Sequence, residues 1–486
     1  MAKAPAGRMQ GVLGADGIER YLGVRYATAE RFERPVAVPA ADGVVDASAY
    51  GPAAPQVPTM LETLLSGDDL PMDEATCLSL NVWTPARDGA TRPVLVWIHG
   101  GAFATGTGRS RWYDGAALAR RGDVVVVTLN YRLGALGFTY GLSPGSGNLG
   151  LLDQVEALRW VRANITAFGG NPDNVTVFGE SAGGASVVAL LAAESARGLF
   201  HRAVAQSASV TQIRPLERAE EAAAELRVAA GGGAPAADAA LRAMATGALV
   251  EAQNTLFVDS FKGITAASPT ADGVVLPDTV ARVLAAAAAN DVPLLLGTTR
   301  DEMALFTAFD TKHAAMDEAM VEAIARRTFG EAGAAALAAY RTDRPGATAS
   351  QLATAIATDA TFRLPALRLA EARSAAGNAT WLYRFTWPSP AFGGVLGACH
   401  GIEIPFVFHN LHQPGVELFL GMGADRAPLA DATADAWLAF GRHGRAGWSP
   451  YTPDDRQVLR LDVDPHVEID PDLATRQAWA GIAAWA

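Results

Sequence analysis

Two serines of the chain lie in a G-x-S-x-G pattern, in which a sharp turn can present a serine hydroxyl as a nucleophile. Ser143 stands within Gly141-Leu-Ser-Pro-Gly145, and Ser181 stands within Gly179-Glu-Ser-Ala-Gly183. Because the pattern occurs twice, the residues around each serine must decide which of the two could do this chemistry.

A reactive serine of this type follows a strand, precedes a helix and uses the amide of the next residue as a donor to an oxyanion. Ser181 meets these demands, because a β-rich run at 175–178 precedes it and a helix-prone segment at 182–193 follows it. Ser143 has no strand before it, and the next residue, Pro144, has no N–H to donate. We therefore predict that Ser181 is a nucleophile and that Ser143 lies in a surface turn.

A glycine-rich segment upstream could supply the other donors that such a serine needs. The run His99-Gly-Gly-Ala-Phe103 directly follows an apolar, strand-like run at 94–98. Small residues there let backbone amides approach a substrate carbonyl, and losing one such donor typically costs ~10² to 10³ in rate. We expect the amides of Gly101, Ala102 and Ala182 to form an oxyanion hole. A tight strand-to-loop turn is the purely structural alternative for the glycines.

No stretch of the sequence provides a complete cofactor or metal site. Residues 145–150 match the G-x-G-x-x-G pattern of nucleotide-binding loops, but no strand precedes them and residues 165–171 contain no acid for a ribose. His409 and His412 are spaced as a metal-binding pair, but a site needs three or four ligands and nothing frames a third. We expect no cofactor and no metal.

The composition excludes several classes of protein. Hydrophobic residues make up 50% of the 486 residues and charged residues 19%, which indicates a globular chain with a large core. The net charge of -12 disfavours nucleic acid and anionic membranes as partners. No apolar run is long enough to span a membrane, the N-terminal residues lack the apolar core of a secretory signal, and two cysteines, Cys77 and Cys399, are too few for a disulfide scaffold. We expect a cytoplasmic protein.

Short apolar runs that do not alternate with polar residues predict strands buried on both faces. These runs lie at 94–98, 124–129, 175–178, 202–206, 293–296 and 381–385. Helical patterns lie between them, for example at 151–165, which predicts an α/β fold with a mostly parallel central sheet covered by helices. We expect a single domain, 1–486, with an Ala-rich helical elaboration over the active site at roughly 210–370, a candidate lid or regulatory region.

Several longer segments together resemble one known family. They are Tyr21-Leu-Gly-Val-Arg-Tyr-Ala27, Leu78-Ser-Leu-Asn-Val-Trp83, the run at 99–103, Asn130-Tyr-Arg-Leu-Gly-Ala-Leu-Gly-Phe138, Asn148-Leu-Gly-Leu-Leu-Asp-Gln154 and the long block at 168–184 that contains Ser181. The resemblance covers most of the chain. The sequence resembles the type-B carboxylesterases, the cholinesterase-like branch of the α/β-hydrolases, and the resemblance implies that fold.

The resemblance also implies an acid and a base. The family's acid lies in a G-x-x-x-D-E segment after a strand, here 297–302, and its base begins an H-x-x-E-x-P-F-V-F segment, here at His400. Glu302 is the implied acid, with its neighbour Asp301 as the alternative. The order serine, acid, histidine agrees with the order found in this fold. Ser207 resembles a supporting serine of the family; a hydroxyl satisfied at a strand end is an equal alternative.

The implied function is that of a serine carboxylesterase, which hydrolyses small to medium carboxylic esters through an acyl-enzyme as a monomer or small homo-oligomer. The Gly-Gly-Ala-Phe loop is similar to the type in relatives that accept bulky and tertiary alcohols. Phe103, Phe306, Phe392 and Phe406 lie near the motifs and could line an apolar pocket or belong to the core. Cleavage of carbamates, lactones or amides by the same triad and a non-catalytic binding role are the alternatives.

Overall fold

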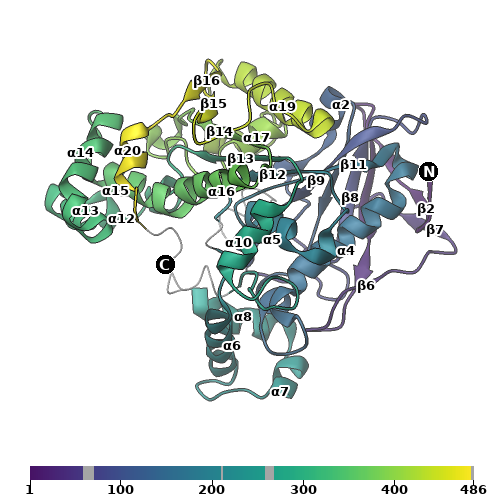
Figure 1. Ribbon diagram of the computed structural model, residues 1–486. Coiled ribbons are helices and arrows are strands. Elements are labelled where there is room, and N and C mark those ends of the chain that lie inside the picture. The colour runs from purple at the N-terminus through teal and green to yellow at the C-terminus, as the bar shows by residue number, and fades with distance from the viewer. Residues whose placement is uncertain (58–69, 210–211, 258–266, 483–486) are drawn as a thin grey trace.

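The centre of the molecule is an eleven-stranded sheet in the order β16-β15-β14-β13-β12-β11-β9-β10-β8-β4-β3 (Figure 1). The computed structural model describes residues 1–57, 70–209, 212–257 and 267–482. The strands of this sheet are β3 (Val12–Leu13), β4 (Glu19–Arg25), β8 (Ser79–Thr84), β9 (Arg92–Ile98), β10 (Val125–Leu129), β11 (Gly170–Glu180), β12 (Arg202–Gln206), β13 (Leu294–Thr299), β14 (Thr380–Phe385), β15 (Gln457–Leu461) and β16 (His466–Ile469).

Neighbouring strands from β15 across to β10 all run parallel, whereas the strands at the two margins pair antiparallel. This arrangement confirms the predicted, mostly parallel sheet of an α/β fold. Two small sheets of the N-terminal region accompany it. One consists of β1 (Ala2–Ala4), β2 (Gly7–Gln10) and β7 (Val44–Asp46). The other consists of β5 (Ala27–Thr28) and β6 (Val36–Ala37).

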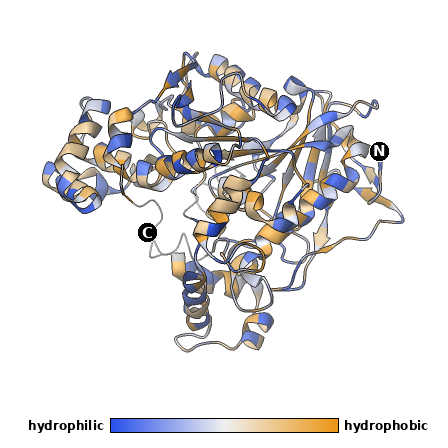
Figure 2. Cartoon of the chain, in the orientation of Figure 1, coloured by the Kyte–Doolittle hydropathy of each residue, from blue (hydrophilic) through white to orange (hydrophobic). Residues whose placement is uncertain are grey.

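Both faces of the central sheet are buried, which explains why its strands read as continuous apolar runs. Successive side chains of a strand point to opposite faces. Accordingly, Val94, Val96 and Ile98 of β9 belong to one hydrophobic core, and Leu95 and Trp97 belong to a second core on the other face. Figure 2 shows hydrophobic residues concentrated along the central strands, while the helices that surround them carry hydrophilic residues as well.

Two layers of helices cover the sheet (Figure 1). The first core includes residues of α4 (Leu149–Asn164), α5 (Ala182–Ala192), α10 (Val280–Ala289) and α16 (Leu364–Ala375). The second core includes residues of α2 (Ala116–Gly122), α17 (Ile404–Val407) and α19 (Arg426–His443). No helix in the described ranges is both long and apolar enough to cross a bilayer.

The region at roughly 210–370 holds two separate groups of helices, which lie apart in Figure 1. The first consists of α6 (Leu216–Ala230), α7 (Asp238–Ala243) and α8 (Thr246–Phe257), and the second of α12 (Thr311–Ala314), α13 (Glu318–Phe329), α14 (Gly333–Asp343) and α15 (Ala349–Thr358). The second group has a small core of its own, which includes Val321, Leu337 and Trp479. Residues 210–211 and 258–266 of this region lie outside the described residues. The single domain and the role of these helices as a lid stay predictions.

Candidate active site

Ser181 lies in the turn between β11 and α5. Its backbone has φ 57° and ψ −121°, a sparsely populated conformation that costs a non-glycine residue on the order of 1–3 kcal/mol and clusters at active sites. The N–H of Ser181 donates to the carbonyl oxygen of Gln206 at 3.0 Å and so ties the turn to β12. Only glycine fits at position 183 of this turn, because a Cβ at Gly183 would lie 2.0 Å from the carbonyl oxygen of Ile98. The turn leaves the Ser181 side chain half-buried at the carboxyl end of β11.

The loop after β9 runs beside this serine. A Cβ at Gly100 would lie 3.1 Å from the Cβ of Ser181. The next two residues, Gly101 and Ala102, have positive φ angles of 104° and 51°. Among the described residues, the N–H groups of Gly101 and Ala102 find no protein acceptor. Ala182 is the first residue of α5, so its N–H has no acceptor within the helix. Three free amides therefore lie around the serine turn.

Glu302 and His400 come together although 98 residues separate them. Glu302 follows β13, and His400 lies in the segment that leads into α17. The Nδ1–H of His400 donates to Oε2 of Glu302 at 2.6 Å, and Oε1 of Glu302 accepts the N–H of Thr299 at 2.8 Å. Glu302 is fully buried and His400 is 5% exposed. The Glu302 carboxylate thus holds a proton on Nδ1 of the imidazole, and Nε2 lies on the side of the ring that faces away from Glu302.

The Nε2 atom of His400 lies next to another carboxylate. Oε1 of Glu180 is 3.1 Å from Nε2, an ion-pair distance without hydrogen-bond geometry. Within the described chain, no hydrogen bond joins His400 to the Ser181 hydroxyl. Hydrogen bonds between a nucleophile and its base are often long without substrate and tighten when substrate binds.

Three buried carboxylates, those of Glu180, Glu302 and Glu403, govern the protonation of His400. Burial lowers the pKa of His400, but the charges of Glu180 and Glu302 outweigh burial and raise the pKa to about 9. Burial raises the pKa of Glu180 to about 7, with only a partial offset from His400. Burial and the charges of the other two carboxylates raise the pKa of Glu403 to about 8. These charges therefore favour a protonated imidazole near neutral pH.

Ser207, the predicted supporting serine, is buried, but its hydroxyl has no hydrogen-bond partner in the described part of the chain. The preceding residue, Gln206, makes the polar contacts instead. Its Nε2 donates to Oε1 of Glu403 at 3.3 Å, and its Oε1 accepts the indole N–H of Trp437 at 2.9 Å. Ser207 follows the last residue of β12 and has a φ of 45°, and its supporting role stays a prediction.

Asp301, the alternative acid, makes a different set of contacts. Its carboxylate pairs with the guanidinium of Arg344 and accepts the N–H of Ala398 at 3.0 Å. Its own N–H donates to the carbonyl oxygen of Ala398 at 2.9 Å. Asp301 therefore joins the segment that carries Glu302 to the segment that carries His400, and the carboxylate that accepts from Nδ1 of His400 is that of Glu302.

The other candidates from the sequence lie elsewhere. Ser143 sits in the turn before α4, where its hydroxyl donates to the carbonyl oxygen of Phe32. His409 bonds to Asp431 at 2.8 Å. Glu180 and Glu403 were not predicted as neighbours of His400. The signal was present, because each lies inside a motif that had been singled out, one beside the nucleophile and the other three residues after His400.

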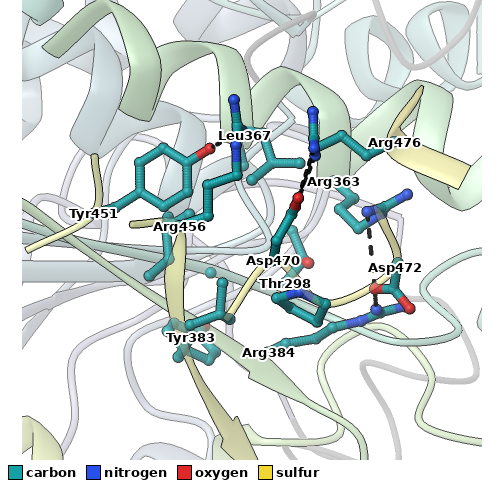
Figure 3. Close-up of a pocket in the computed structure, with 15 residues that line it drawn as sticks. Thr298, Arg363, Leu367, Tyr383, Arg384, Tyr451, Arg456, Asp470, Asp472 and Arg476 are labelled. Atoms are coloured by element: carbon teal, nitrogen blue, oxygen red, sulfur yellow. Dashed lines mark hydrogen bonds and ion pairs between the residues drawn. The ribbon is translucent and has the colours of Figure 1, made fainter. Parts of the chain in front are cut away.

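A small cavity lies at β13, β14 and β15, where Figure 3 shows several charged side chains converging. Its volume of about 40 Å³ leaves room for about one water molecule. Its arginines are already paired: Arg384 with Asp472, Arg476 with Asp470, Arg363 with Asp359 and Arg456 with Glu371. Neither Ser181 nor His400 lines this cavity, so it is not the place where an ester would meet the serine.

Known proteins are similar to this chain in sequence and in fold. The sequence model of the carboxylesterase family matches residues 2–479. The para-nitrobenzyl esterase of Bacillus subtilis is 37% identical over 476 residues, which cover 95% of each chain. Phenmedipham hydrolase of Pseudarthrobacter oxydans is 36% identical over 493 residues, 98% of this chain and 97% of the relative. The crystal structure of carboxylesterase EST55 of Geobacillus stearothermophilus matches with a TM-score of 0.85 at 38% identity and covers 98% of this chain and 99% of that chain.

The sheet, the serine turn and these structural relatives define an α/β-hydrolase. More narrowly, the chain belongs to the carboxylesterase family, and it is a carboxylic ester hydrolase.

Proposed function

We propose that Ser181, His400 and Glu302 are the nucleophile, the base and the acid of this esterase. The Ser181 oxygen attacks the ester carbonyl carbon while Nε2 of His400 takes the hydroxyl proton. Glu302 holds the imidazole tautomer and stabilises the imidazolium that forms. His400 then protonates the leaving alcohol oxygen as its bond to the acyl carbon breaks. Water attacks the acyl-enzyme by the reverse proton path and releases the acid.

The amides of Gly101, Ala102 and Ala182 are the proposed donors to the oxyanion. Negative charge develops on the carbonyl oxygen only as the tetrahedral intermediate forms, so fixed donors stabilise that state more than the bound ester. The absence of protein acceptors for Gly101 and Ala102 in the described chain supports this role, because these amides are not already used.

The observation that carries the proposal is the strained backbone of Ser181 beside this loop. A covalent intermediate gives the direct test. Acid-quenched mixtures of enzyme and p-nitrophenyl butyrate should yield one butyryl group on the peptide that contains Ser181, as found by mass spectrometry. The peptide that contains Ser143 is the internal control and should stay unmodified. Butyrylation elsewhere, with the Ser181 peptide unmodified, would contradict the assignment.

The substrate range is the second part of the proposal. The loop at 99–103 leads us to propose that bulky and tertiary alcohol esters are accepted, and hydrolysis of tert-butyl acetate tests this, with methyl acetate as the control. Relatives carry names as different as para-nitrobenzyl esterase, phenmedipham hydrolase and acylcarnitine hydrolase. Relative rates on matched esters, carbamates, lactones and amides would show which of these bonds the enzyme prefers. A cytoplasmic location and a monomeric or small homo-oligomeric state stay predictions.

A further inference from the structure

The side chain of His99 is buried at the start of the loop that carries two of the proposed oxyanion donors, and the proposed triad does not use it. Its ring stacks on that of Tyr131, with centroids 4.5 Å apart and planes inclined by 23°. A Cβ at Gly106 would lie 2.5 Å from Nδ1 of His99, so only glycine fits against this edge of the ring. The side-chain amide of Gln56 holds Gly106 there, because it accepts the Gly106 N–H at 2.7 Å and donates to the Gly106 oxygen at 2.9 Å. The imidazole is therefore held in one orientation.

The protonation of this imidazole follows from its surroundings. Nδ1 of His99 lies 2.8 Å from the carbonyl oxygen of Gly100. A carbonyl oxygen can only accept, so Nδ1 carries a proton and donates it. Burial lowers the pKa of His99 to about 4, so the ring is neutral near neutral pH and Nε2 is unprotonated. Nε2 has no hydrogen-bond partner in the described part of the chain, so the polar contact of this ring is the one with Gly100.

The carbonyl oxygen of Gly100 and the N–H of Gly101 belong to one planar peptide group. A hydrogen bond that holds the oxygen therefore also sets the direction in which the N–H points. It polarises the peptide group as well, which strengthens the N–H as a donor. The N–H of Gly101 is a proposed oxyanion donor and finds no acceptor among the described residues.

The other two donor peptides are held by the backbone. The peptide group that carries the Ala102 N–H has the carbonyl oxygen of Gly101, which accepts the N–H groups of Ala104 and Thr105 at 3.0 and 2.9 Å. The third donor peptide opens α5 and is fixed by that helix. Across the described ranges, no backbone N–H binds the oxygen of Gly100, so a side chain takes that role.

We propose that His99 is a positioning residue, which fixes the N–H of Gly101 as a donor to the oxyanion. This proposal rests on the proposed function. His99 acts through the peptide group and not on the ester itself. Without its N–H, the peptide can rotate and its donor loses alignment with the oxygen of the tetrahedral intermediate. Because the bound ester depends less on this donor than the intermediate does, the loss should fall on kcat rather than on KM.

Three substitutions separate the N–H of His99 from its ring. His99→Phe keeps a ring that can stack on Tyr131 and removes the N–H, whereas His99→Leu removes both. His99→Asn has nearly the shape of the leucine variant but places an N–H where Nδ1 was. His99→Phe and His99→Leu should lower kcat for p-nitrophenyl butyrate by about 10- to 100-fold, less than the loss of a whole donor, with KM nearly unchanged. His99→Asn should stay within about threefold of wild type, because it keeps the hydrogen bond.

A pair of inhibitors gives a readout that a partly unfolded sample does not distort, because an inhibition constant does not depend on the amount of active enzyme. The ketone 1,1,1-trifluoro-4-phenylbutan-2-one can add the serine oxygen and form an oxyanion. The matching alcohol, 1,1,1-trifluoro-4-phenylbutan-2-ol, cannot. His99→Phe should weaken binding of the ketone by about the factor by which kcat falls, and it should leave binding of the alcohol unchanged.

The matched control is His201→Phe. The His201 ring accepts the N–H of Val175 at 3.2 Å, and the residue precedes β12, at the end of that strand away from Ser181. Its kcat and both inhibition constants should stay close to wild type. Equal ketone affinity of His99→Phe and wild type, or equal losses in His99→Asn and His99→Leu, would overturn the role of His99. A wild type that binds the ketone no more tightly than the alcohol would instead contradict the proposed attack by Ser181, so the two failures are distinguishable.

Discussion

The Nδ1 atom of His400 lies 2.6 Å from Oε2 of Glu302, in a contact sealed from solvent on both sides. A carboxylate in this position can only accept, so the neutral imidazole keeps its proton on Nδ1 and leaves Nε2 unprotonated, as the proposed role of His400 as a base requires. This contact links two distant parts of the sequence, and the proposed mechanism depends on it.

Replacing the Glu302 carboxylate by an amide should keep the shape of the site and greatly lower the catalytic rate. Glu302→Gln can present an N–H to Nδ1 and so favour the wrong tautomer. We expect kcat for p-nitrophenyl butyrate to fall by about 10³- to 10⁴-fold with little change in KM. Circular dichroism controls for folding. Activity within tenfold of wild type would show that another group orients His400.

Glu180 should set the pH at which the enzyme becomes active. The base must be neutral, and the Glu180 and Glu302 charges raise the pKa of His400 to about 9, so wild-type kcat/KM should rise with pH until the pH passes that value. Glu180→Gln removes one negative charge beside Nε2, which lowers the pKa of His400 and shifts the acidic limb of the profile to lower pH. Profiles of kcat/KM between about pH 6 and 10.5 measure this shift.

A control variant separates the effect of the Glu180 charge from the effect of removing any carboxylate from the protein. Asp278→Asn removes an exposed carboxylate that pairs with Arg282, and it should leave the profile where it is. A Glu180→Gln profile that coincides with wild type, or that moves to higher pH, would contradict the electrostatic coupling.

Asp301 should act as a positioning residue. Asp301→Ala removes the acceptor for the Ala398 N–H and the partner of Arg344, which loosens the segment that carries His400. Small misplacements of catalytic groups cost up to ~10² in rate, so we expect kcat to fall by about 10- to 100-fold with KM nearly unchanged. Asp301→Asn should recover part of the loss, because an amide oxygen still accepts the Ala398 N–H. Equal activity of Asp301→Ala and wild type would refute this role.

The buried ion pair between Arg132 and Asp153 should matter for stability. The side chains are 3% and 0% exposed, and the guanidinium donates to both oxygens of the carboxylate. Asp153→Ala leaves an unpaired buried charge and should lower the free energy of unfolding by about 3–5 kcal/mol. The exposed pair of Arg282 and Asp278 is the control, and Asp278→Ala should cost less than about 1 kcal/mol. Urea denaturation measures both; equal losses would contradict the argument.

Much of the sheet could be predicted from the sequence because its parallel strands are buried on both faces. The apolar runs at 94–98 and 202–206 are strands β9 and β12. The marginal strands β15 and β16 were not predicted, because they are short and partly exposed and so lack a continuous apolar run.

The residues of the site also differ in how far the sequence alone predicts them. Ser181 and its amide donors could be proposed from local sequence, since turn, strand and helix lie within a few residues. Glu302 and His400 needed the family resemblance, because only the folded chain brings them together. The contacts of Gln206 could not be predicted, because β12 ends at this residue and the backbone turns to a positive φ at Ser207, so the sequence does not determine which way these side chains face.

The most direct test of the account compares two serines in the same sequence pattern. We would measure the hydrolysis of p-nitrophenyl butyrate by wild type, Ser181→Ala and Ser143→Ala, each checked for folding. The account predicts a loss of at least about 10⁴-fold in kcat for Ser181→Ala, as expected when a nucleophile is removed, and a rate within about twofold of wild type for Ser143→Ala. A folded Ser181→Ala variant with ordinary turnover would show that Ser181 is not the nucleophile.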